Sequence, residues 1–89
     1  MADIVLGMSS TMASALIKAI RAERAALDIS QAELGERLGW SRQMIAKIEA
    51  GDRSVAVHEL PELCRALECG VLDLLGRAEG MDRDLLRLP

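Results

Sequence analysis

The 89-residue sequence contains almost no aromatic residues: Trp40 is the only one, and phenylalanine and tyrosine are absent. A core built from Leu, Ile, Ala and Met suits packed helices better than sheets, in which aromatic and β-branched residues are enriched. No apolar run approaches the roughly 20 residues that cross a bilayer, and the N-terminus lacks a charged leader followed by a long apolar segment. We therefore expect one helical, cytoplasmic domain without a membrane segment.

Cysteine and histidine are too few for metal chemistry. Cys64 and Cys69 stand five positions apart and His58 is the only histidine, so the sequence holds no cluster of about four closely spaced zinc ligands. Both cysteines occupy apolar positions and are expected to be buried, reduced thiols. There is also no glycine-rich phosphate loop and no nucleophile–base constellation. We expect no metal, no cofactor and no enzymatic activity.

The sequence also has no excess of basic residues, since its net charge is −3. This net charge is the main argument against a nucleic-acid partner. The distribution of charge weakens that argument. From Ser14 to Ser54 seven basic residues stand against six acidic ones, a balance of +1, and the excess acid lies outside this segment. Binding through phosphate neutralisation is expected to be modest and sensitive to salt.

Residues 29–51, ISQAELGERLGWSRQMIAKIEAG, contain two short helical patterns with a tight break between them. The first begins at Ser30, whose hydroxyl is a good N-cap and forms a capping box with Glu33. Apolar residues then recur at helical spacing up to Gly39, which fits the left-handed position that follows a helix.

The second helix is expected over residues 42–50, with Ser41 as its N-cap and Gly51 at its end. Its apolar positions face inward, and its outward face carries Arg42, Gln43, Ala46 and Lys47. Two helices joined by so short a break form a helix-turn-helix. The outward face of the second helix is then free to enter a groove of DNA.

Arg42, Gln43 and Lys47 are the candidate base-contacting residues. Arginine can bond the O6 and N7 of guanine together, and glutamine the N6 and N7 of adenine, both in the major groove. The first two lie at the start of the helix, which approaches the base edges most closely. Lys47, one turn beyond Gln43, reaches a base or the adjacent phosphate. Met44 borders this face and is assigned to the core, with contact to a thymine methyl as the alternative.

These residues resemble the core motif of the Cro and phage-repressor (XRE-like) helix-turn-helix family. The resemblance covers roughly residues 14–76, and it is carried by Ser30, Gln31, Leu34, Leu38, Gly39, Ser41, Ile45, Ile48, Glu49 and Gly51. It implies an all-α, five-helix domain like that of the lambda repressor, with double-stranded DNA as partner. It also implies an ion pair between Arg24 and Glu49 that ties the first helix to the recognition helix, the alternative being an exposed Arg24.

Four residues around the motif are expected to contact the DNA backbone. Gln31 lies at a helix N-terminus, where an amide beside free N–H groups can bind a phosphate, and the resemblance implies the same role. Ser41 begins the second helix, and Arg53 lies in the loop that often meets the backbone in the family. Trp40 has two interpretations: it packs on Ile45 as a hydrophobic staple, or its indole edge lies against the backbone.

Two positions depart from the family pattern. Gly35 stands where the family usually has alanine, and we expect it to keep the required small volume at a cost of about 1 kcal/mol in helix propensity. Glu68 stands where the family usually has a helix-ending glycine, and Gly70 is expected to take over that turn. The departure at Gly35 is interpreted as a matter of stability and not as a change of function.

Further helices are expected at about residues 10–27, 57–68 and 71–77, so that the DNA-binding domain spans residues 10–77. Residues 1–9, with Ile4-Val5-Leu6, are either a frayed leader or an arm that packs on a partner subunit. Residues 78–89 form a tail that is either disordered or covers a partner subunit, and it carries Leu85, Leu86 and Leu88.

Together these features predict a sequence-specific transcriptional repressor that binds a palindromic operator as a homodimer, since one recognition helix offers few base contacts. One alternative is an antitoxin that binds its operator and a toxin protein, and an anti-repressor is another protein partner of this kind. A second alternative is an interaction domain that has lost DNA binding, against which Arg42, Gln43 and Lys47 argue.

Overall fold

Five α-helices and one short 3-10 helix make up residues 10–85, the part of the chain that the computed structural model describes, with side chains described for residues 13–80. The elements are α1 (Ser10–Ala26), α2 (Gln31–Leu38), α3 (Arg42–Ala50), the 3-10 helix η2 (Val57–Glu59), α4 (Leu60–Ala66) and α5 (Val71–Leu85). No strand occurs within residues 10–85. The predicted all-α, five-helix architecture is confirmed.

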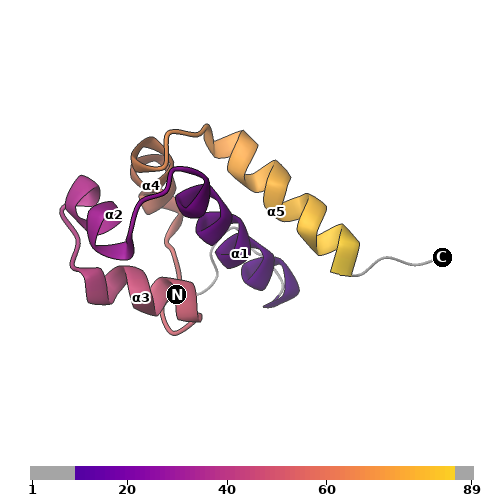
Figure 1. The fold of residues 1–89 in the computed structure, drawn as a ribbon. Helices are drawn as coiled ribbons and strands as arrows, with labels where there is room; N and C mark the ends of the chain where they lie inside the picture. The colour runs from indigo at the N-terminus through magenta and orange to yellow at the C-terminus, as the bar shows by residue number, and fades with distance from the viewer. Residues whose placement is uncertain (1–9, 86–89) are drawn as a thin grey trace.

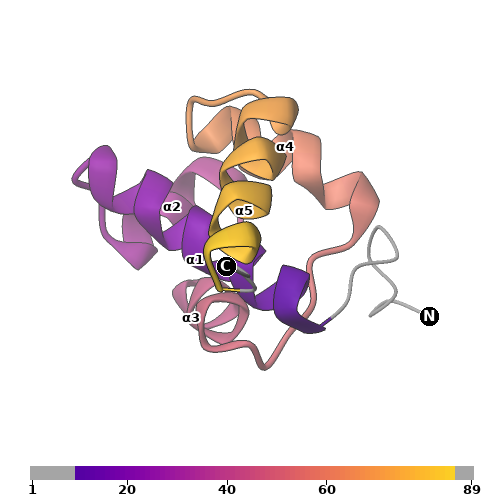
Figure 2. The same cartoon turned by 90° about the vertical axis from the view of Figure 1, so that its right-hand side faces the viewer.

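The helices form two groups that share one core. α1 and α5 lie side by side and make the most extensive contact between elements, while α2 and α3 form a compact corner next to α4 (Figure 1). Seen from the side, α5 covers α1, and α3 lies below α1 (Figure 2). Each group contributes aliphatic side chains that are almost fully buried, among them Ile20, Leu34, Ile45, Ile48, Leu63, Leu67 and Leu74. Within residues 10–85 no helix is long and apolar enough to cross a membrane.

The ends of α2 and α3 follow from local sequence signals. The Ser30 hydroxyl accepts the Glu33 N–H at 3.0 Å, and the Glu33 carboxylate accepts the Ser30 N–H at 2.8 Å, which completes the capping box. Ser41 caps α3 by accepting the Met44 N–H at 3.1 Å. Gly39 and Gly51 end the two helices with φ of 72° and 83°, in the left-handed region that glycine adopts without a Cβ penalty. These caps fix the angle at which α3 leaves the turn.

The helix expected over residues 57–68 begins differently from the prediction. Its first residues form η2, and α4 starts only at Leu60. Pro61 has no N–H to donate to the carbonyl of Val57, so an α-helix starting at Val57 lacks that bond. The segment forms a 3-10 helix instead, in which hydrogen bonds join residues three positions apart. The Glu59 N–H donates to the Ala56 carbonyl at 2.9 Å.

The turn after α4 is made by Glu68 itself, and the expectation that Gly70 takes it over is wrong. Glu68 has φ of 58°, whereas Gly70 has no positive φ. A non-glycine residue in this region costs roughly 1 kcal/mol. Arg37 holds the turn in place, because its Nη1 donates to the carbonyl of Ala66 and to the carboxylate of Glu68, both at 2.9 Å.

α5 runs to Leu85, eight residues beyond the predicted end at Arg77. Its inner face remains small and apolar in this extension, since Ala78 is completely buried. Arg77 also pairs with Glu23 of α1 across 2.9 Å. Packing on α1 thus stabilises a segment that is too short to be helical alone. The Ile4-Val5-Leu6 segment, Leu86 and Leu88 lie outside the described residues.

Candidate nucleic-acid interface

The outer face of α3 is polar and exposed, while its inner face is buried in the core. Arg42, Gln43 and Lys47 are exposed, whereas Ile45 and Ile48 are each only 1% exposed. Met44 is half-buried and packs against the core. The division matches the pattern expected from the sequence, so the three candidate base-contacting residues lie on one accessible helix face.

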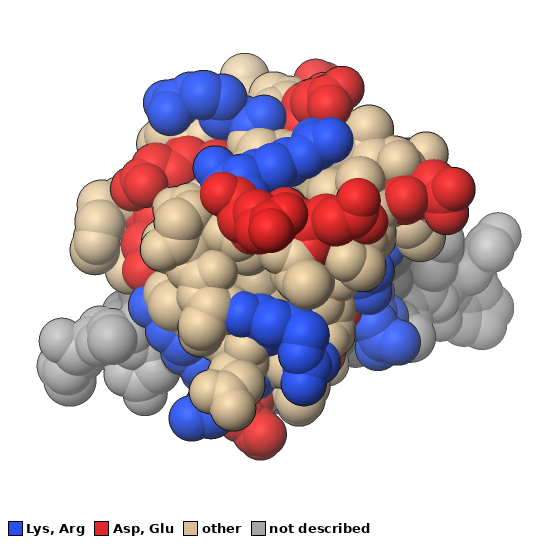
Figure 3. Space-filling model, turned by 60° about the vertical axis from the view of Figure 1, so that its left-hand side comes forward, with Lys and Arg blue, Asp and Glu red and all other residues tan. Residues whose placement is uncertain are grey.

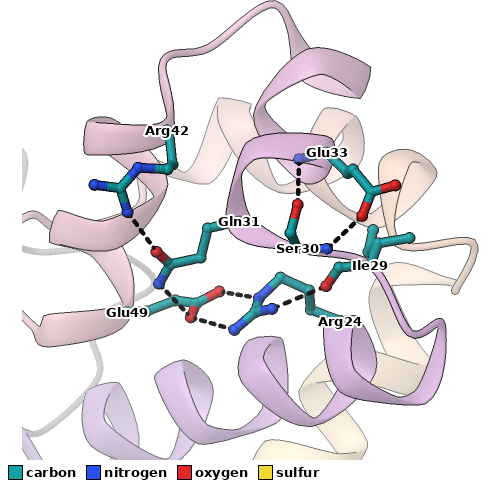
Figure 4. Close-up of polar contacts among 7 residues, drawn as sticks. All are labelled: Arg24, Ile29, Ser30, Gln31, Glu33, Arg42 and Glu49. Carbon is teal, nitrogen blue, oxygen red and sulfur yellow. Dashed lines mark hydrogen bonds and ion pairs between the residues drawn. The ribbon is translucent and has the colours of Figure 1, made fainter.

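A hydrogen-bond network connects this face to α1 and α2 (Figure 4). Arg24 donates through Nε and Nη2 to the two carboxylate oxygens of Glu49, at 2.7 and 2.9 Å, and through Nη1 to the carbonyl of Ile29 at 2.9 Å. Gln31 donates to Glu49 Oε1 at 3.0 Å and accepts from Arg42 Nη1 at 3.2 Å. Four side chains from three helices are therefore held in one arrangement.

The ion pair at the centre of this network is largely shielded from solvent. The side chains of Arg24 and Glu49 are 20% and 5% exposed. Burial alone would raise the pKa of Glu49, but the hydrogen bonds from Arg24 and Gln31 hold that pKa below its usual value. The bond to Glu49 in turn raises the pKa of Arg24. Both groups stay charged, and the pair orients α3 against α1.

Gln31 has a connecting role that the sequence did not reveal. Its amide NH₂ binds Glu49 and its amide oxygen binds Arg42, so both ends of the side chain are engaged (Figure 4). Its position at the first residue of α2 suggested a phosphate contact or, as the alternative, an ordinary exposed residue. The link to Arg42 joins two side chains 11 residues apart, and no capping or periodicity signal in the sequence identifies that pair.

Trp40 and Arg53 meet beside the N-terminal end of α3. The Arg53 guanidinium lies 5.8 Å from the centroid of the Trp40 ring, within the range of a cation–π contact. Its Nη2 and Nη1 lie 2.7 and 3.2 Å from the carboxylate oxygens of Glu59, and Nη1 also donates to the carbonyl of Ser54 at 3.1 Å. Trp40 itself packs against the hydrophobic core. The loop after α3 is thereby tied to the last residue of η2.

Glu59 is a second residue that sequence reasoning missed. Besides binding Arg53, its carboxylate accepts the Ala56 N–H at 2.9 Å. The hydrogen bond from Arg53 lowers the pKa of Glu59, and the bond from Ala56 lowers it further, against the opposing effect of burial. A capping signal would need Ser or Thr three residues before the glutamate, and Ala56 stands there instead.

Gly35 lies where the turn approaches α2 closely, in line with the expectation that this position needs a small residue. The Trp40 N–H donates to the Gly35 carbonyl at 2.8 Å, and this bond brings the turn close to α2. A Cβ on Gly35 would lie 2.6 Å from the carbonyl oxygen of Trp40. That distance is far inside van der Waals contact, so even alanine does not fit without movement of the backbone.

Among the described residues no three His, Cys, Asp or Glu side chains form a group able to hold a metal ion. Cys64 is buried and Cys69 half-buried, and both are free thiols. Burial raises the pKa of Cys64 to about 12, so its thiol stays protonated and unreactive.

A capped helix-turn-helix with a polar face on its second helix defines a class of DNA-binding proteins. The chain belongs to the XRE-type helix-turn-helix family, whose sequence model, described as Helix-turn-helix, matches residues 20–74. It is a DNA-binding transcriptional regulator.

The chain is similar to the clp gene regulator ClgR from Corynebacterium glutamicum, in two crystal structures of that protein. In one the identity is 32% and the TM-score 0.72, and the match covers 78% of this chain and 90% of that chain. In the other the identity is 30% and the TM-score 0.74, with 85% of this chain and 87% of that chain covered. No functionally curated protein sequence matches significantly.

Proposed function

We propose that the protein is a sequence-specific repressor that binds a palindromic operator in double-stranded DNA as a homodimer. The observation that carries this proposal is the placement of Arg42. Its side chain is exposed at the N-terminus of α3, and one of its nitrogens is held by Gln31. A guanidinium that is already oriented loses less conformational entropy on binding. Its other N–H groups can donate to the O6 and N7 of guanine.

Gln43 and Lys47 extend base reading along the same face. Gln43 follows Arg42 directly and would address adenine, while Lys47 lies one turn further along α3. Gln31, Trp40, Ser41 and Arg53 surround this helix and are proposed to contact the DNA backbone. Arg53 would contribute less to that contact, because the Glu59 carboxylate already neutralises its charge. The likeness to a gene regulator supports a role in transcription.

The proposed dimer would use α5. Leu72, near the start of that helix, is 83% exposed, which is unusual for a large apolar side chain. Gly76, one turn further on, is also exposed and has nothing within 4 Å of the position where a Cβ would lie. This face is open to a second copy of the chain. A two-fold dimer would place two recognition helices roughly 34 Å apart, in successive major grooves.

Footprinting on the DNA that flanks the protein's own gene tests the proposal. We expect protection of two half-sites whose centres lie about 10 base pairs apart. Arg42→Ala should shift the protection to higher protein concentration, by about 1–3 kcal/mol in binding free energy, whereas Arg65→Ala removes an equal charge from α4 and should leave the protection unchanged. Protection that is uniform along the fragment, or absent at all concentrations, would contradict a sequence-specific repressor.

A further inference from the structure

The lysine and arginine side chains divide into those paired within the chain and those left unpaired. Within residues 13–80, four arginines form ion pairs of 2.7 to 2.9 Å: Arg24 with Glu49, Arg37 with Glu68, Arg53 with Glu59 and Arg77 with Glu23. The same part of the chain holds five cations without an ion pair: Lys18, Arg21, Arg42, Lys47 and Arg65. A phosphate gains most from a cation whose charge is not already neutralised.

Two of these unpaired cations lie on α1, outside the helix-turn-helix. Lys18 and Arg21 are exposed, and together with Arg24 they line a shallow hollow. Its remaining lining residues are Ala22 and Ala25, so the lining includes no acidic side chain. The two alanines leave open space beside the cations. A negatively charged group can therefore approach this part of α1 without meeting a carboxylate.

A chain of hydrogen bonds connects the hollow to the base-reading face of α3. Arg24 lines the hollow and also binds Glu49, which binds Gln31, which binds Arg42. Arg21 lies near enough to Glu49 for its charge to help lower the pKa of that carboxyl, although it is not the main cause. In Figure 3 Lys and Arg side chains lie both above and below a band of Asp and Glu side chains.

Arg65 differs from the other unpaired cations in its surroundings. It lines a separate hollow between α2 and α4, where Glu62 and Glu68 are among the neighbouring side chains. Arg37 also lines this hollow and is paired with Glu68, so Glu62 is the remaining lining carboxylate that offsets the positive charge of Arg65. Arg65 is therefore a poor phosphate ligand and a suitable internal control.

We propose that the DNA-binding surface extends from α3 across the exposed face of α1, where Lys18 and Arg21 bind phosphates of the same duplex. The inference rests on the proposed function and adds a second contact region to it. Lysine supplies a point charge and arginine a planar fork that fits two phosphate oxygens. In a chain with a net charge of −3, whose acidic groups repel DNA, two unpaired cations on one helix carry a large share of the attraction.

Single-charge variants test the inference. Lys18→Gln, Arg21→Gln and Arg65→Gln each remove one charge from an exposed position, so they change the net charge equally. Affinity for a mixed-sequence duplex of about 20 base pairs is measured at several KCl concentrations, since each phosphate contact contributes about 0.9 to the slope of log K against log salt. For each bound subunit we expect a slope smaller by about 0.9 and an affinity roughly eightfold lower at 0.1 M salt for Lys18→Gln and Arg21→Gln, so a bound homodimer should show twice this change in slope.

Arg65→Gln measures the effect of net charge alone and is expected to match the wild-type slope. Lys18→Arg keeps the charge and should restore wild-type binding, which separates phosphate contact from an effect on folding. Equal slopes for all three single-charge variants would overturn the proposal for α1. A wild-type chain that binds no duplex at all would instead refute the proposed function, so the two failures are distinguishable.

Discussion

Glu49 is the residue on which most of the interface depends, and Glu49→Gln tests this dependence. Both of its oxygens act as acceptors: Oε2 receives Arg24 Nε, and Oε1 receives Arg24 Nη2 and Gln31 Nε2. Whichever way the new amide turns, its NH₂ group faces a donor. The substitution therefore removes the charge and at least one hydrogen bond, although the volume of the side chain is unchanged.

The size of the loss follows from burial. Removing one partner of a buried ion pair costs about 3–5 kcal/mol, because the other charge is left uncompensated. Arg24 keeps 20% exposure and its bond to Ile29, so we expect the lower end, about 3 kcal/mol. A domain of this size has a total stability of about 5–15 kcal/mol. The variant should therefore fold, but its free energy of unfolding should be much smaller than that of the wild type.

Urea unfolding followed by circular dichroism measures this loss. With an m-value of about 1.5 kcal/mol/M, the midpoint should fall by about 2 M. The matched control is Glu68→Gln, which makes the same chemical change in the Arg37–Glu68 pair, whose side chains are 38% and 59% exposed. An exposed pair contributes about 0–1 kcal/mol. Similar losses in the two variants, or a loss below about 1 kcal/mol for Glu49→Gln, would refute the argument from burial.

Four other measurements test the remaining conclusions. Arg42→Ala and Gln43→Ala should each weaken binding to the cognate site by about 1–3 kcal/mol, with much smaller effects on unrelated DNA; equal effects on both would make them backbone contacts. Gly35→Ala should lower stability by about 1–2 kcal/mol, because the clash with the Trp40 carbonyl outweighs the gain in helix propensity; an increase in calorimetric Tm would contradict this. Glu49 and Glu59 have pKa values held below the usual 4.5, so their stabilisation is complete above that pH and is lost as the pH falls further; unfolding midpoints should decline below about pH 4.5, and less steeply in Glu49→Gln. Sedimentation at micromolar concentration should give a dimer that Leu72→Glu converts to a stable monomer, and a monomeric wild type would exclude the dimer.

The features predicted from local residue patterns depend on residues close together in the chain, whereas the Arg24–Glu49 pair, 25 positions apart, was predicted through the family resemblance. Ser30 with Glu33, Ser41, Gly39 and Gly51 act within one helical turn, so their capping roles can be read directly. The aliphatic spacing of α3 likewise separates its buried face from its exposed face. Local signals of this kind place the helix-turn-helix and its three candidate base-contacting residues.

The features that were missed depend on how distant segments meet. Gln31 accepts a hydrogen bond from Arg42, 11 residues away in the chain, and Arg53 reaches Glu59 across the loop after α3. The continuation of α5 depends on the surface of α1, against which Ala78 is buried. Helix propensity alone makes Gly35 look unfavourable. Its benefit is that it leaves space for the nearby Trp40 carbonyl, a contact that helix propensity does not describe. None of these contacts produces a periodic pattern or a recognisable motif in the sequence.

The internal pairing of four arginines has a consequence for how the protein would search a chromosome. Each of these charges is neutralised by a carboxylate of the same chain, so it contributes little to adhesion to DNA of arbitrary sequence. A genome presents about 10⁶–10⁹ competing sites, which retain most copies of a strongly basic regulator. A regulator with few unpaired cations is retained less by this background. Fewer copies per cell are then needed to keep an operator occupied, and changes in protein level are followed by rapid changes in occupancy.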